Sequence, residues 1–166
     1  MRAPKELMVK IIWACAYIQE PASIQEEGGK THYLMAWSLV AEVSATNQTL
    51  EIKAFRDKRN NPCFVFEIHP NSVVSTMKKQ DIHYQSQHLV KAPLTIGSLA
   101  EILQKASYPA PETNTNKNRL ALLEAALAEL KNLKKIDTDG KKDFFEKVKA
   151  GCWVPSGGSD LFTKAK

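Results

Sequence analysis

The sequence predicts an α+β fold, in which an N-terminal antiparallel β-meander packs against helices and a helical pair follows. Up to about residue 70, apolar side chains alternate with polar ones or form short continuous runs, as is typical of strands. After about residue 97, apolar side chains recur every three or four residues, which is the spacing of one helix face. The chain has 166 residues. A chain of that size buries about 70% of its unfolded surface, so it needs no disulfide bonds to hold a core.

Four strands are expected in the first seventy residues. The segment MVKIIWACAYIQ (8–19) is almost continuously apolar and predicts a strand that is buried on both faces. In HYLMAWSLVAEVS (32–44), a long alternation favours a strand, although Leu, Met and Ala also suit a helix. The segments TLEIKAFRD (49–57) and CFVFEIHP (63–70) alternate on either side of an Asn-containing connection, which predicts a hairpin with a loop longer than two residues.

Helices are expected in the second half of the chain. The segment GSLAEILQKASY (97–108) predicts one helix, with Ser98 as its N-cap and Glu101 completing a capping box. We therefore expect an α+β domain over 1–108. The prolines and polar residues that follow predict a linker over 109–117, and then come a helical hairpin over 118–150 and a flexible tail over 151–166.

The corner of the expected hairpin, KIDTDGKKDFFE (135–146), partly matches an EF-hand calcium loop. Gly140 falls on the sixth position and Glu146 on the twelfth, as the motif requires. Lys135, however, brings an ammonium group to the first position, where an anionic oxygen should bind the cation. The end of one helix and the start of the next account for every residue, so we expect no calcium here.

No arrangement of residues in the sequence predicts catalysis or metal binding. Cys63 and His69 share a strand face but lie six residues, or about 20 Å, apart, which is too far for a nucleophile and its base. The histidines lack the paired spacing of a zinc site, and no phosphate loop or hydrolase motif follows a strand. We expect a protein without cofactor or metal, and without catalytic activity.

Cysteine usage and hydropathy bear on the compartment. The cysteines, Cys15, Cys63 and Cys152, are odd in number and widely spaced, which indicates a reducing compartment such as the cytoplasm. The apolar run at 11–18 is too short to cross a bilayer, which takes about 20 residues, so no membrane span is expected.

The expected hairpin combines cations with an aromatic ring. The net charge of +5 permits an anionic partner without requiring one. Basic groups beside an aromatic side chain on a sheet can stack single-stranded bases, although Glu51 and Glu67 interrupt this face. Charge on an edge hairpin also protects against aggregation, which is the simpler interpretation. The residues concerned are Lys53, Phe55, Arg56, Lys58 and Arg59.

A noncatalytic protein-binding module is therefore the function that we expect. Its contact residues would be apolar positions on the long helix, Leu122 and Leu133, and Trp153 in the tail. A nucleic-acid-binding protein that uses the basic hairpin is the alternative, and a small enzyme with no recognisable motif is a weaker one.

The C-terminal segment FFEKVKAGCWVPSGGSDLFTKAK is polar and rich in small residues, and Leu161 and Phe162 form a short hydrophobic element near its end. In this texture it resembles the C-terminal tails of effectors that intracellular bacteria export through type IV (Dot/Icm-type) secretion. The resemblance implies translocation into a host cell cytosol, where the protein would act as an effector or adaptor on a host protein.

Overall fold

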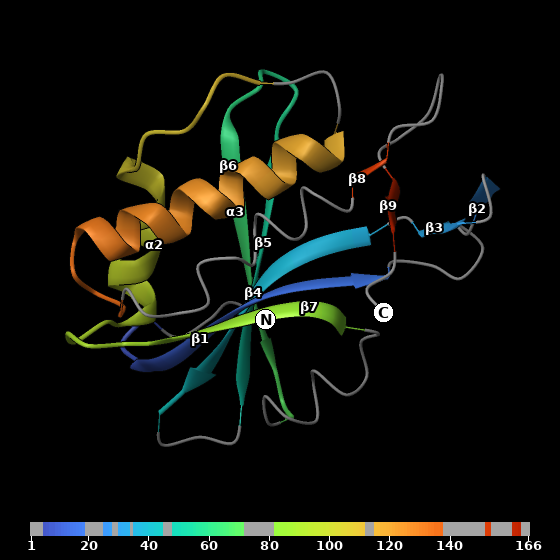
Figure 1. Cartoon of the computed structure of the whole chain (residues 1–166). Coiled ribbons are helices and arrows are strands. Elements are labelled where there is room, and N and C mark those ends of the chain that lie inside the picture. Colours follow the sequence, from blue (N-terminus) through green and yellow to red (C-terminus); the bar gives the residue numbers. More distant parts are fainter. Residues whose placement is uncertain are drawn as a thin grey trace.

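The computed structural model describes residues 5–18, 25–27, 30–33, 35–44, 48–71, 82–111, 115–137, 152–153 and 161–163. Two antiparallel sheets and two helices make up this part of the chain (Figure 1). The α+β fold predicted from the sequence is thus confirmed. Among these residues, no helix has both the length and the apolar character that crossing a membrane requires.

The larger sheet has five strands in the order β6-β5-β4-β1-β7. Every neighbouring pair is antiparallel, and the four strands expected from the sequence, β1, β4, β5 and β6, lie side by side in chain order. Strand β1, an interior strand between β4 and β7, is nearly continuous in apolar residues because both of its faces are buried. The strands are β1 (Val9–Ile18), β4 (Met35–Val43), β5 (Thr49–Arg56), β6 (Pro62–His69) and β7 (Ile82–Leu89).

The smaller sheet has four short strands in the order β2-β3-β9-β8. Its last two strands come from the segment that the sequence predicts to be a flexible tail, so part of that tail is paired β-structure. In particular, Trp153 pairs with Leu161. The strands are β2 (Gln25–Glu27), β3 (Lys30–Tyr33), β8 (Cys152–Trp153) and β9 (Leu161–Thr163).

The helices α2 (Ile96–Lys105) and α3 (Thr115–Asn132) lie on one face of the larger sheet (Figure 1). Leucines of α3 pack onto apolar side chains of β1, β4 and β5, and together they form the main core. Each such side chain contributes about 2 kcal/mol when it is fully buried. The helix residues in this core include Leu99, Leu103, Leu120, Leu122, Leu123, Leu127 and Leu130.

The structure differs from the sequence predictions in the burial of one contact residue and in one helix boundary. Leu122 has no exposed surface and belongs to the core, so it is not available to a partner, whereas Leu133 is 46% exposed. Helix α3 begins at Thr115, inside the predicted linker. The second helix of the predicted hairpin, and most of the segment compared with a calcium loop, lie outside the described residues.

Helix α2 begins three residues earlier than the sequence predicts. Its N-cap is Thr95, whose hydroxyl accepts a hydrogen bond from the Ser98 amide at 3.0 Å. The Ser98 hydroxyl in turn accepts one from the Thr95 amide at 2.9 Å, which completes a capping box. Thr95 takes this position because Leu94 and Ile96 on either side are buried in the core.

The β5–β6 hairpin closes through a three-residue loop. The Asn60 amide donates to the Asp57 carbonyl at 2.9 Å, and Asn60 has a φ of 63°. This is a turn followed by a left-handed residue, a geometry that asparagine tolerates well. The amides of Asn61 and Arg59 also donate to the Asp57 carboxylate, and these bonds lower its pKa. The loop fixes the register of the hairpin, so Arg56 pairs with Pro62.

Helix α3 ends in a Schellman motif. The Lys134 amide donates to the Lys131 carbonyl at 3.0 Å, and the Lys135 amide donates to the Leu130 carbonyl at 2.9 Å. Lys134 has a φ of 57°, so a lysine occupies the left-handed position where glycine is usual. A residue with a Cβ atom is strained there by about 1 kcal/mol.

The substitution Lys134→Gly is therefore expected to stabilise the fold by about 1 kcal/mol, because glycine adopts this conformation without a steric cost. Urea denaturation followed by circular dichroism measures the change. The matched control is Lys131→Gly, inside the last helical turn, which should destabilise by up to about 1 kcal/mol. A loss of stability in Lys134→Gly would show that residue 134 is not left-handed in solution.

Candidate functional site

The two faces of the β5–β6 hairpin carry different groups. Alternate residues of each strand point to opposite faces, so one set meets the helices and the other faces away from them. On the helix side, Phe64 and Phe66 of β6 pack against the core. On the far side, Glu51 of β5 lies directly opposite Glu67 of β6.

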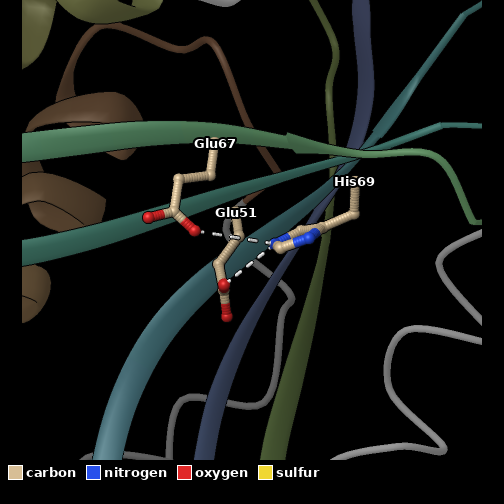
Figure 2. A group of neighbouring side chains, drawn as sticks. All are labelled: Glu51, Glu67 and His69. Atoms are coloured by element: carbon tan, nitrogen blue, oxygen red, sulfur yellow. Dashed lines mark hydrogen bonds and ion pairs between the residues drawn. The ribbon is translucent and has the colours of Figure 1, made fainter. Parts of the chain in front are cut away.

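A cluster of titratable side chains occupies the far side of the hairpin, and Figure 2 shows its three members turned toward one another. The Nε2 atom of His69 lies 3.1 Å from Oε1 of Glu51 and 3.9 Å from Oε2 of Glu67. Lys53 also approaches this oxygen of Glu51, with its Nζ atom at 3.7 Å. The Glu51 side chain is only 4% exposed, so little water reaches its carboxylate.

A groove of about 650 Å³ lies on the helix side, between β6, α2 and the extended segment 106–111. Its wall is mainly apolar. The rings of Phe64 and Tyr108 lie 5.5 Å apart, and Leu103 and Pro109 also line it. The Tyr108 hydroxyl donates to the Leu103 carbonyl, and burial, with the nearby charge of Glu129, raises the pKa of Tyr108 to about 12.

Arg56, the last residue of β5, is the single charged residue among those that line this groove in the described part of the chain. Its guanidinium donates to two carbonyl oxygens, that of Asn60 at 2.7 Å and that of Pro109 at 2.5 Å. Its Nε atom is buried and has no hydrogen-bond partner within the described residues. No carboxylate of the described chain pairs with it, so Arg56 brings an uncompensated cation to an apolar groove.

The residues predicted as a basic surface are divided between both faces of the hairpin. Lys53 and Phe55 share the far face with Glu51, whereas Arg56 turns to the groove. Lys58 and Arg59 are exposed in the loop between β5 and β6. Of the residues predicted for protein contact, Leu133 is exposed, Leu122 is buried, and Trp153 lies in β8, where only its backbone is described.

Two possible nucleophiles on the larger sheet are buried. The Ser86 hydroxyl and His88 Nε2 are 3.0 Å apart, within the reach of a nucleophile and its base. Both residues are at most 2% exposed beneath the helices, so no substrate reaches them. Cys15 is also buried, and this burial, with the charge of Glu51, raises its pKa to about 12, so its reactive thiolate form is suppressed.

Comparisons with known proteins gave no match: no family model, no curated protein and no solved structure is similar to this chain.

Sequence reasoning missed both the groove and the cluster of Glu51, Glu67 and His69. The alternation of β5 and β6 placed the two glutamates on one face, but it did not give their register. A three-residue loop that ends in a left-handed Asn60 sets Glu51 opposite Glu67, and this turn chemistry could have been read from the residues around Asp57. The bond between Arg56 and Pro109 joins residues 53 apart in the chain, and no local pattern predicts it.

His88 is expected to make the fold sensitive to acid. Burial, with the charge of Lys131, lowers its pKa from 6.5 to about 4, although Asp137 opposes the shift. Between these two values the unfolded chain binds a proton that the folded chain does not, so stability falls as the pH drops from about 6.5 to about 4. The loss attributable to His88 is on the order of 3 kcal/mol.

Urea denaturation at pH 7, 5.5 and 4.5, on the wild type and on His88→Gln, measures this contribution. Glutamine keeps a polar group beside Ser86 but does not titrate, so the variant should lose less stability over the same interval. Parallel pH profiles of the two proteins would rule out His88 as the cause.

Proposed function

We propose that this protein is a noncatalytic protein-binding module, and that its groove between β6 and α2 holds a short segment of a partner protein. The segment carries an apolar side chain next to a carboxylate. The observation on which this rests is Arg56, an uncompensated cation in the wall of an apolar groove.

The environment of Arg56 favours a carboxylate. Two carbonyl oxygens already fix the orientation of the guanidinium, so little side-chain entropy is lost when a ligand binds. An arginine has five N–H donors in a planar fork, and a carboxylate accepts two of them side by side. The two carbonyls take one N–H from each terminal nitrogen of Arg56, so a second N–H on each nitrogen is left for the ligand. A hydrogen bond to a charged group is worth about 1.5–3 kcal/mol.

The rest of the groove suits an apolar side chain. Its volume of about 650 Å³ is within the range of ligand-binding sites, which is roughly 300–1,000 Å³. The aromatic and aliphatic groups of Phe64, Leu103 and Tyr108 give the partner a surface from which water is excluded. A charged residue at the edge of such a surface fixes the direction of the bound segment, while the apolar contact supplies affinity.

The one nucleophile and base that lie within hydrogen-bond distance of each other in the described residues, Ser86 and His88, are buried, which supports a binding role over a catalytic one. The positive net charge of +5 attracts acidic partners over longer distances. The resemblance of the tail to type IV effector tails points to a host-cell protein as the partner, and hence to an effector or adaptor role.

Selection of random peptides against the purified full chain tests this proposal. We expect the selected peptides to combine a large apolar residue with an aspartate, a glutamate or a free C-terminus. Fluorescence polarisation of one such peptide should show binding weakened by roughly tenfold or more in Arg56→Gln, which follows from the lost charged hydrogen bonds. The matched control is Arg59→Gln, which removes an exposed cation outside the groove and should leave affinity within about twofold.

A second pair of variants tests the groove itself. Gln104→Trp places a bulky ring on the groove wall and should block the peptide, whereas Lys105→Trp, one residue along α2 and outside the lining, should not. Selected peptides that bind all four variants equally would overturn the proposal. Binding of single-stranded RNA that weakens steeply with salt and is lost on Arg59→Ala would instead favour the nucleic-acid alternative.

A further inference from the structure

We propose that Glu51, Glu67 and His69 form a binding site for a divalent transition-metal ion of the zinc class. This site lies on the face of the β5–β6 hairpin that points away from the helices, opposite the groove. It therefore does not depend on the function proposed above.

The distances between the donor atoms fit a single ion. One oxygen or nitrogen from each side chain lies within 4.8 Å of the other two. Zinc binds such atoms at about 2.0–2.2 Å, so two donors in a tetrahedral site are about 3.4 Å apart. The distances from His69 to Glu51 and to Glu67, 3.1 and 3.9 Å, lie on either side of that value. Small changes of side-chain rotamer complete the site without movement of the backbone.

The charges of the cluster also favour a cation. Glu51 and Glu67 are directly opposite each other across the two strands, and like charges in that arrangement repel. The Glu51 carboxylate is 4% exposed, so water screens it weakly. Lys53 supplies one positive charge at 3.7 Å, but its side chain is 46% exposed and its charge is largely hydrated. An ion of charge +2 balances both carboxylates.

The hairpin holds the three donors in place before an ion binds. The pairing of β5 with β6 runs without a bulge from Thr49 and His69 to Arg56 and Pro62. Beyond His69, the Thr49 hydroxyl donates to the Asn71 carbonyl at 2.8 Å, which ties the end of β6 to β5. Donors on paired strands are positioned more precisely than donors on a loop, so ion binding requires little ordering of the chain.

The donor set selects the class of ion. An imidazole with two carboxylates suits zinc and its neighbours, whereas magnesium and calcium prefer oxygen donors alone. Three protein donors leave a fourth position for a water molecule or for a group from another molecule. Protons compete with the metal for the imidazole, so affinity decreases as the solution becomes more acidic.

Isothermal titration of the metal-free full chain with zinc chloride at pH 7.5 tests the proposal. We expect one ion per chain, and at least a tenfold loss of affinity in Glu67→Gln and in His69→Gln, because each variant removes one of three donors. Two control variants should bind zinc as the wild type does. Glu101→Gln removes an exposed carboxylate of α2, and Cys63→Ser removes a thiol on the same strand face as Glu67.

Thermal unfolding separates a metal site from a purely structural charge cluster. Without metal, Glu67→Gln should be as stable as the wild type or more so, because it removes the repulsion with Glu51. With zinc present, the wild type should gain stability and Glu67→Gln should not. The proposal would be overturned by a titration without binding, by zinc binding that is unchanged in both donor variants, or by equal zinc stabilisation of wild type and Glu67→Gln.

Discussion

The packing of α3 on one face of the five-stranded sheet is the contact on which the rest of this structure depends. Leucines of the helix and apolar side chains of β1, β4 and β5 exclude water from a single core. The sheet must keep its register under this helix, because a slip by one residue would exchange the side chains of its two faces. Helix α2 also forms the second wall of the groove, since it reaches β6 at the edge of the sheet.

Local patterns of apolar residues in the sequence were sufficient to predict most strands of the larger sheet and both helices. The apolar runs and alternation predicted β1, β4, β5 and β6, because each of these strands buries at least one row of apolar side chains. Strand β7 was missed since two of its inward-facing residues, Ser86 and His88, are polar, so the segment lacks the usual alternation. The cap of α2 was placed three residues late, because burial of Leu94 and Ile96 decides where that helix starts.

The chemistry of the surface was much harder to predict than the fold. Glu51, Glu67 and His69 meet only because the three-residue loop 58–60 sets one particular register between two strands. Arg56 belongs by sequence to a row of basic residues, yet its position in the strand turns it away from Lys53 and toward Pro109. Functional groups of this kind come together through tertiary contacts, and spacing along the chain does not reveal them.

The alternation of β6 has a consequence for how this protein tolerates change in length. Phe64 and Phe66 line the groove, while Glu67 and His69 belong to the cluster on the opposite face. Insertion or deletion of a single residue in the turn at 58–60, if the pairing adjusted to it, would exchange the two sets, sending phenylalanines to water and charged groups beneath α2. The length of this exposed turn is thus under a tighter constraint than its polar composition suggests. A change in that length would disrupt the groove and the Glu51–Glu67–His69 cluster together.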